Sequence, residues 1–177
     1  RIKEIGKEGV YAMVCDSTNV FSQGWSGSEG DLQKSLYKII KDQKGRVLIT
    51  TFASNIARLE TIASVAKKLG RHIVIAGFSL HRIVDIAHKC GYLMDYEFLE
   101  PREAKGFNKD KILILCTGCQ GETNAALTKI ATGIHPNIEL EEDDTVIFSS
   151  KIIPGNDKRI YSVFNKLILK NINIITE

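Results

Sequence analysis

Four short apolar runs in this chain each stop at a cluster of small polar residues. The runs and the polar residues that follow them are Val10–Cys15 with Asp16-Ser17-Thr18-Asn19, Val47–Thr50 with Thr51-Phe52-Ala53-Ser54-Asn55, Ile112–Cys116 with Thr117-Gly118-Cys119-Gln120-Gly121-Glu122, and Val146–Phe148 with Ser149-Ser150 and, soon after, Pro154-Gly155-Asn156. In a parallel sheet the carboxyl ends of the strands lie along one edge, beside helix N-termini whose free N–H groups bind anions and nucleotides. The pattern therefore predicts a phosphate-binding edge rather than a self-contained catalyst.

Strand-like and helical patterns alternate along the chain. The apolar runs are continuous, as expected for strands covered on both faces. They fall at Tyr11–Cys15, Arg46–Thr51, His72–Gly77, Lys111–Cys116, Thr145–Ser149 and Ile172–Thr176, with a further short candidate at Tyr96–Leu99. Helical spacing predicts helices over about Glu29–Asp42, after Asn55, over Leu80–Lys89 with Ser79 as its cap, over Gly121–Ala131 and over Asn156–Lys170. This alternation implies right-handed crossovers and a doubly wound, mainly parallel α/β sheet with helices on both faces.

The remaining segments are expected to be loops. They are Pro101–Asp110 and Thr132–Asp144, the second of which ends in the acidic run Glu139–Asp144. We expect that run to be a solvated turn rather than a metal site.

Length and composition indicate one globular domain over residues 1–177. Hydrophobic residues make up 44% and charged residues 25%, and the net charge of +3 is too weak by itself to indicate nucleic-acid binding. No apolar run approaches the roughly 20 residues that span a bilayer, and no signal-peptide pattern is present. We therefore expect a cytoplasmic protein without membrane contact. Because the chain begins with Arg1, we expect it to be a piece of something longer.

Neither the cysteines nor the histidines form a recognisable metal or catalytic motif. Cys116 and Cys119 have C-x-x-C spacing, but a redox pair would need Cys119 in a helix-opening position, and nothing else redox-like accompanies it. The two cysteines inside apolar strand runs, Cys15 and Cys116, instead fit a structural burial role in a reducing cytoplasm. The four histidines match neither H-x-H-x-D-H nor H-E-x-x-H, and no nucleophile–base pair is evident. The residues alone indicate a binding domain with no metal ligands.

Each polar strand end has a structural and a functional interpretation. Ser54 or Asn55 either caps the next helix or shares its N-terminus with a phosphate, with Phe52 stacking on a base. Gly118 and Gly121 either form a turn or let the backbone approach a ligand closely.

Two further polar strand ends leave the same choice open. Pro154-Gly155-Asn156 is either a turn or part of the binding edge. Asp16 either caps a turn or orients a metal-binding histidine through a hydrogen bond.

Taken together and in order, these motifs resemble the bacterial ribonuclease J family. They are Asp16–Asn19, Gly45–Asn55, Thr117–Glu122 and Ile152–Asn156. The matched part looks like the β-CASP domain, an insert that covers a metallo-β-lactamase domain in these enzymes. The resemblance implies a full-length metal-dependent ribonuclease, in which two zinc ions held by the metallo-β-lactamase domain support RNA phosphodiester hydrolysis by 5′–3′ exonuclease and/or endonuclease activity. Those zinc motifs are missing from this sequence, so the resemblance implies an RNA-clamping domain that is inactive alone.

The resemblance also implies roles for particular residues. It places Asp16 beside the metal site, where it would support a histidine supplied from outside this chain. The implied RNA-binding residues are Phe52, Ala53, Ser54, Asn55, Gly118, Gln120, Gly121, Glu122, Pro154, Gly155 and Asn156. Two positions depart from the family pattern: Phe78 stands where arginine is common, and Cys119 where serine is. The implied partners are RNA, the chain's own metallo-β-lactamase domain and, at full length, further copies of the protein.

Two other classes of function fit the same residues. A free-standing doubly wound module could bind a nucleotide or phosphosugar at its strand ends. An interaction domain could instead dock a partner through an exposed face.

Overall fold

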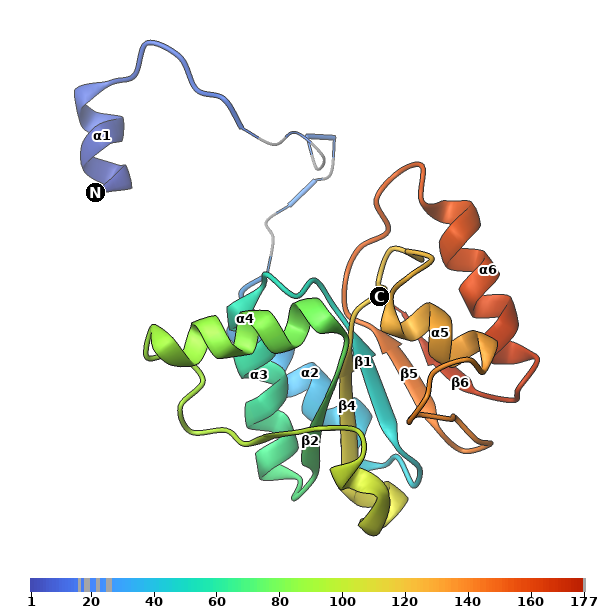
Figure 1. The fold of residues 1–177 in the computed structure, drawn as a ribbon. Helices are drawn as coiled ribbons and strands as arrows, with labels where there is room; N and C mark the ends of the chain where they lie inside the picture. Colours follow the sequence, from blue (N-terminus) through green and yellow to red (C-terminus); the bar gives the residue numbers. More distant parts are fainter. Residues whose placement is uncertain (16, 18–19, 22, 25–26, 177) are drawn as a thin grey trace.

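Six parallel strands form a single sheet in the computed structural model, in the order β3-β2-β4-β1-β5-β6 (Figure 1). The structure describes residues 1–15, 17, 20–21, 23–24 and 27–176. The strands are β1 (Val47–Thr50), β2 (His72–Ala76), β3 (Phe98–Leu99), β4 (Ile112–Cys116), β5 (Thr145–Phe148) and β6 (Asn173–Ile175). The parallel α/β sheet predicted from the apolar runs is confirmed.

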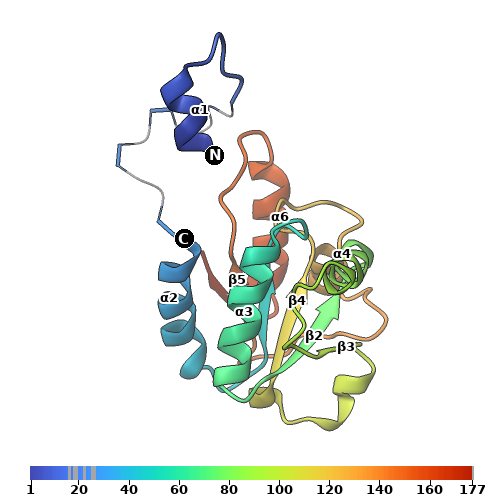
Figure 2. The ribbon, with the colours of Figure 1, turned by 90° about the vertical axis from the view of Figure 1, so that its left-hand side faces the viewer.

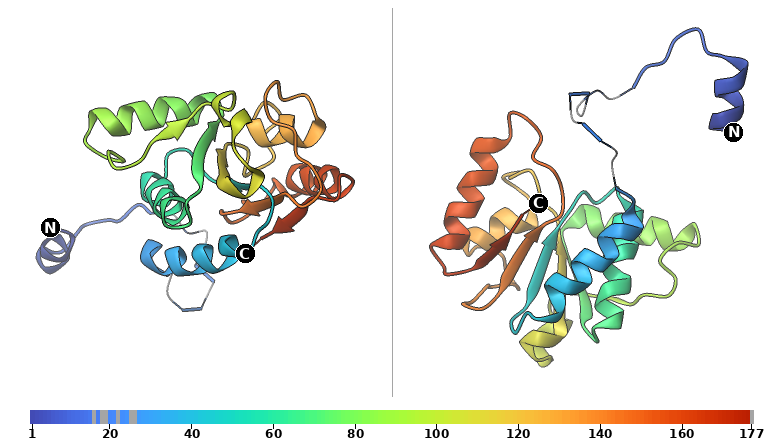
Figure 3. Two further views of the ribbon diagram at one scale, coloured as in Figure 1. Left: turned by 90° about the horizontal axis from the view of Figure 1, so that it is seen from below. Right: turned by 180° about the vertical axis from the view of Figure 1, so that it is seen from behind.

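Helices cover both faces of this sheet. The helices of the described residues are α1 (Ile2–Glu8), which does not pack on the sheet, α2 (Glu29–Lys41), α3 (Ile56–Lys68), α4 (Phe78–Lys89), α5 (Ala126–Thr132) and α6 (Asp157–Ile168), with 3-10 turns η1 (Glu103–Gly106) and η2 (Lys109–Lys111). Helices α2, α3 and α4 pack on one face and α5 and α6 on the other (Figure 3). Helices α2 and α3 lie side by side (Figure 2), and Gln33 Nε2 donates to Ser64 Oγ across them at 2.7 Å. Helix α1 has no buried residue.

The continuous apolar runs arise because every strand feeds two hydrophobic clusters. In β4, Ile112, Ile114 and Cys116 join the cluster under α5 and α6, whereas Leu113 and Leu115 join the cluster under α2, α3 and α4. Burial of each such side chain contributes about 1.5–3 kcal/mol to folding. Both faces of the strand therefore require apolar residues.

The crossover helices that follow neighbouring strands lie on opposite faces of the sheet. Helices α3 and α4 carry the chain from β1 to β2 and from β2 to β3, whereas α5 and α6 carry it from β4 to β5 and from β5 to β6. Neighbours β2 and β4 therefore send their chains to opposite faces, and so do β1 and β5. Such reversals open the crevices in which doubly wound sheets bind ligands.

The predicted first strand is wrong. Residues 11–15 have no strand structure, and Tyr11, Met13 and Val14 are exposed. An apolar run needs a neighbouring strand to satisfy its backbone groups, and within the described residues no strand of the sheet pairs with this one.

Two helix starts also differ from the prediction. Helix α4 begins at Phe78 with Gly77 as its cap, so Ser79 lies inside the first turn. Helix α5 begins at Ala126 rather than at Gly121, because Gly121 lies in a turn that packs against α6. The φ of Gly121 is +69°, and an added Cβ would lie 2.6 Å from the carbonyl carbon of Arg159. Glycine supplies both the positive φ and the close approach.

The acidic run is not simply a solvated turn. Asp144 is fully buried, and its Oδ2 accepts from Arg46 Nη2 at 2.7 Å and from the Glu141 N–H at 2.9 Å. Its Oδ1 accepts from the Arg46 N–H at 2.8 Å. Asp144 thus fixes the start of β5 to the start of β1, at the edge opposite the polar strand ends. The loop predicted at Pro101–Asp110 contains η1 and the start of η2.

Across the part of the chain that the structure describes, no helix is long and apolar enough to cross a membrane.

Candidate functional site

Three of the four polar motifs lie along one edge of the sheet. In the strand register Thr50 stands beside both Cys116 and Phe148, so the loops that follow β1, β4 and β5 leave the same edge. Ala76 stands beside Cys116, which adds the start of α4 to that edge. The predicted common edge is therefore confirmed for these motifs. Asp16, the candidate of the fourth motif, lies outside the described residues.

The loop after β1 presents an aromatic ring and a hydroxyl group. Asn55 is the cap of α3, and its Oδ1 accepts from the Arg58 N–H at 3.1 Å. Phe52 is 38% exposed, Ser54 is exposed and Ala53 is half-buried. Because Asn55 performs the capping, the Phe52 ring and the Ser54 hydroxyl stand available at the helix N-terminus.

Arg58 holds this loop in place, and sequence reasoning missed it. Its Nη1 donates to the carbonyl oxygen and to Oγ of Ser149, both at 2.8 Å. Its Nε and Nη2 donate to the Glu29 carboxylate at 2.7 and 2.9 Å, and this hydrogen bonding lowers the pKa of Glu29. Arg58 therefore joins α2, α3 and the end of β5. The sequence indicated the role of Arg58 only through its position in the first turn of the capped helix.

The loop after β4 is fixed from inside by Gln120. This side chain is 4% exposed, and its Nε2 donates to the Lys151 carbonyl oxygen at 2.9 Å. Its Oε1 accepts from the Ile153 N–H at 3.0 Å and from Asn156 Nδ2 at 3.2 Å. Gln120 therefore joins the loops after β4 and β5.

The remaining predicted residues of the loop after β4 divide by exposure. Gly118 and Gly121 are buried, whereas Glu122 is exposed and accepts from the Gln120 N–H at 3.0 Å through Oε2. Glu122 is thus the predicted residue of this loop whose side chain reaches the surface.

The loop after β5 is an exposed turn with one anchored residue. Pro154 and Gly155 are exposed, and the Gly155 N–H donates to Asp157 Oδ2 at 3.1 Å. Asn156 is half-buried, and its Oδ1 accepts from Arg159 Nη2 at 2.6 Å. This places the exposed Arg159 guanidinium beside the predicted motif.

The cysteines do not form an activated redox pair. Both Cys116 and Cys119 are buried free thiols, and burial raises the pKa of each. Cys119 lies in the loop before α5 rather than at its start. A thiol with a raised pKa is a poor source of thiolate.

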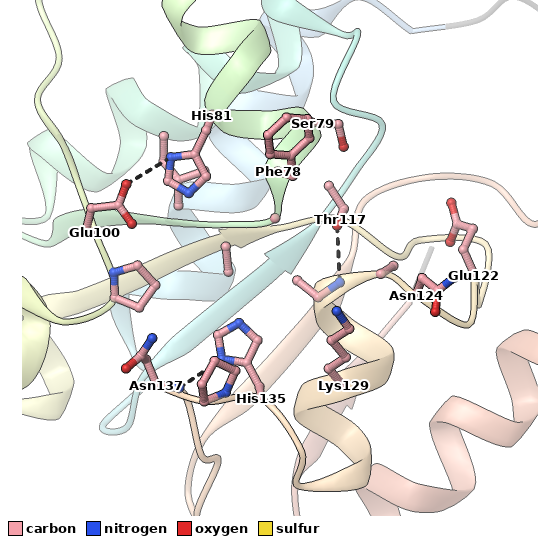
Figure 4. A pocket seen from close by; sticks show the side chains of 17 residues that line it. Phe78, Ser79, His81, Glu100, Thr117, Glu122, Asn124, Lys129, His135 and Asn137 are labelled. Atoms are coloured by element: carbon pink, nitrogen blue, oxygen red, sulfur yellow. Dashed lines mark hydrogen bonds and ion pairs between the residues drawn. The ribbon is translucent and has the colours of Figure 1, made fainter.

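A cavity of about 600 Å³ opens between the carboxyl ends of β2 and β4 (Figure 4). Its walls come from the start of α4, the end of β4, helix α5 and the segment after α5. The polar and aromatic side chains labelled around it are Phe78, Ser79, His81, Glu100, Thr117, Glu122, Asn124, Lys129, His135 and Asn137. Sequence reasoning missed this site because its residues come from separate segments that carry no shared motif.

The described residues do not fit a zinc centre. Among them, no group of three or more histidine, cysteine, aspartate or glutamate side chains could hold a metal ion. The histidines have other contacts: His72 stacks on Phe107 with ring centroids 3.8 Å apart, and His81 Nδ1 lies 3.3 Å from Glu100 Oε1. Zinc ligands would have to come from outside the described residues.

Comparison with known proteins identifies the family. Residues 44–167 match the family described as "Ribonuclease J, beta-CASP domain". The chain belongs to the ribonuclease J family. It is 44% identical to Ribonuclease J of Sinorhizobium meliloti over 178 residues, covering 100% of this chain and 32% of that protein. It is 38% identical to Ribonuclease J 1 of Streptococcus pyogenes (99% of this chain, 32% of that protein) and 39% identical to Ribonuclease J of Mycoplasma pneumoniae (94% and 30%).

The match covers only part of each relative. The chain spans about a third of the length of these relatives. The matched β-CASP residues include the loops after β1, β4 and β5 and all the residues that line the cavity. The six-stranded α/β sheet is consistent with a β-CASP domain, as the resemblance implied.

Proposed function

We propose that residues 1–177 form one β-CASP domain that clamps RNA in a longer, zinc-dependent ribonuclease. The observation that carries the proposal is the convergence of the loops after β1, β4 and β5 on one sheet edge, in a chain of the ribonuclease J family. The longer protein would hydrolyse RNA phosphodiester bonds during RNA processing, as a 5′–3′ exonuclease, an endonuclease or both. It would act in the cytoplasm and assemble with further copies of itself.

The loop after β1 supplies the first RNA contacts in this proposal. The half-exposed Phe52 ring offers a face on which a base stacks, and such stacking contributes about 1–3 kcal/mol per base. The Ser54 hydroxyl and the Ala57 N–H donate to a phosphate, since the neighbouring Ile56 and Arg58 N–H groups already bond to Ser54 and Asn55. Asn55 and Arg58 hold these donors in place through the cap and the Glu29 ion pair.

The loops after β4 and β5 supply a second wall. Gln120 fixes both loops by bonds to Lys151, Ile153 and Asn156. This leaves Glu122, Pro154 and Gly155 at the surface, and the exposed Arg159 guanidinium bonds to Asn156. A few fixed donors along a groove hold a single strand with little net charge, in keeping with the net charge of +3.

Hydrolysis itself is assigned to residues outside this chain. Two zinc ions, held by the metallo-β-lactamase domain, would supply an activated water and stabilise charge on the phosphate. Asp16 would support one of their histidine ligands by a hydrogen bond. The described residues would position the strand, so this chain alone would not cleave RNA.

Substitution of Phe52 tests the clamp. In the full-length protein Phe52→Ala should weaken single-stranded RNA binding by about 5- to 100-fold, because one stacked base is lost. Tyr92→Ala is the matched control, because Tyr92 is also an exposed aromatic residue but lies beyond the far end of α4. Equal RNA affinity of the Phe52→Ala, Ser54→Ala and wild-type proteins would overturn the assignment of this loop.

A further inference from the structure

The cavity between β2 and β4 lies apart from the loops that are assigned to RNA. Its lining includes no residue of the 51–55 loop or of the loop after β5, and it shares only Glu122 with the predicted RNA-binding residues. It lies where the chain leaves β2 for one face of the sheet and β4 for the other. Its volume of about 600 Å³ is that of a small-molecule site and is far more than a single phosphate fills.

One wall of the cavity carries free backbone donors. Helix α4 begins there at Gly77 without a side-chain cap, and the Leu80 and His81 N–H groups bond to the Gly77 carbonyl oxygen. The N–H groups of Phe78 and Ser79 therefore have no partner within the helix. Gly77 permits this placement: its φ is +126°, and an added Cβ would lie 2.6 Å from Thr117 Oγ1.

The opposite wall carries Lys129 and His135 (Figure 4). Lys129 is the only lysine or arginine among the described lining residues. His135 Nδ1 accepts from the Ile138 N–H at 3.1 Å and from the Asn137 N–H at 3.3 Å. Burial and the charge of Lys129 lower the pKa of His135, so its ring is neutral near pH 7. Because Nδ1 is an acceptor, the ring hydrogen is on Nε2, which becomes a donor.

The mouth of the cavity carries an aromatic ring and two carboxylates. Phe78 is 84% exposed on the first turn of α4 and offers a stacking surface. Glu100 lies beside His81, with 3.3 Å between Oε1 and Nδ1, and Glu122 accepts from the Gln120 N–H. Because the lining holds one lysine and two glutamates, it would repel a triphosphate more strongly than a single phosphate, and the cavity suits a ligand with one phosphate group.

We propose that this cavity binds one nucleoside monophosphate unit, with its phosphate between the start of α4 and Lys129 and its base over Phe78. The unit is either a nucleotide within the RNA strand or a free mononucleotide such as a product of hydrolysis. The inference rests on the proposed function for its choice of ligand. The apolar wall formed by Ile75, Ala76 and Pro101 accommodates the sugar and one face of the base.

Titration with uridine monophosphate and with inorganic phosphate tests the site. The protein should bind the nucleotide at least about tenfold more tightly than phosphate, since a stacked base contributes about 1–3 kcal/mol. Lys129→Gln should weaken binding of both ligands by about tenfold. Phe78→Ala should weaken nucleotide binding alone. Lys44→Gln is the matched charge control, because Lys44 is exposed just before β1 at the opposite sheet edge.

One further variant and one competitor complete the test. Phe52→Ala should leave mononucleotide affinity unchanged while it lowers RNA affinity. Displacement of the bound mononucleotide by single-stranded RNA would identify the strand as the source, and simultaneous binding of both would identify a free nucleotide. Lack of nucleotide binding, or wild-type affinity in folded Lys129→Gln and Phe78→Ala proteins, would overturn the site. If RNA affinity still depended on Phe52 in that case, the clamp would stand without the cavity.

Discussion

The loops after β1 and β4 leave the same sheet edge but use their polar residues differently. In the loop after β1, Asn55 caps the helix while Phe52 and Ser54 remain exposed. In the loop after β4, Gly121 and Gln120 are buried, and the Gln120 amide bonds to Lys151, Ile153 and Asn156 in the loop after β5. Similar motifs thus leave side chains exposed in one loop and bury them as structural links in the next. Substitutions should therefore lower stability in the second loop and lower ligand affinity in the first.

Substitution of Gly121 should have the largest effect on stability. Gly121→Ala forces a Cβ to within 2.6 Å of the Arg159 carbonyl carbon at a positive φ, and should lower the free energy of unfolding by about 3 kcal/mol. Gly155→Ala is the matched control, because Gly155 also has a positive φ (+93°) but nothing within 4 Å of the added Cβ. Urea unfolding measures both. Equal losses would show that the approach to α6 is unimportant.

Gln120→Ala should have the next largest effect. It leaves the Ile153 N–H and the Lys151 carbonyl oxygen without the Gln120 partner, which should cost about 2 kcal/mol. Thr123→Ala, an exposed change three residues away, should shift the free energy of unfolding by less than about 0.5 kcal/mol. If both variants unfolded at the same urea concentration, the distinction between buried and exposed residues in this loop would fail.

Removal of Arg58 should lower stability by about 1 kcal/mol at neutral pH, since the Glu29 ion pair is partly screened by solvent. The pair lowers the pKa of Glu29 below its ordinary value of 4.5. Its stabilisation is therefore present above about pH 4.5 and is lost as the pH falls through the lowered pKa. Arg58→Met should show less acid destabilisation than the wild type between about pH 6 and pH 3. An unchanged pH profile of the free energy of unfolding would argue against this assignment.

The smallest effect is expected at His135. Its pKa is lowered from 6.5 by burial and by Lys129, so the unfolded chain binds its proton first as the pH falls. Stability should decline as the pH drops below about 6.5, until the folded form also protonates. His135→Asn retains an acceptor for the two backbone N–H groups and should reduce this decline by about 2 °C or less in melting temperature. A steeper acid decline in the variant would contradict the stated cause.

The sheet could be predicted from the sequence because its signal is local. Runs such as Ile112–Cys116 are apolar at every position, which is what a strand buried on both faces requires. The same signal failed at residues 11–15, because an apolar run does not reveal whether a neighbouring strand exists.

The site was less predictable because its determinants lie far apart in the chain. The burial of Gln120 depends on acceptors and donors more than 30 residues away, and the start of α5 depends on contact between Gly121 and α6. The cavity brings Phe78, Lys129 and His135 together from separate elements. Phe52 and Ser54 could be proposed from the sequence, because a residue just after a strand end needs no distant partner to be noticed.

The single amide group of Gln120 has a mechanical consequence. Because it holds Lys151, Ile153 and Asn156 from the neighbouring loop, neither loop can shift without breaking or dragging these bonds. A force on the loop after β4 is therefore transmitted to the loop after β5, and the two loops move as one rigid unit. If RNA binds along this edge as proposed, it would contact one coupled surface rather than two loops that move independently.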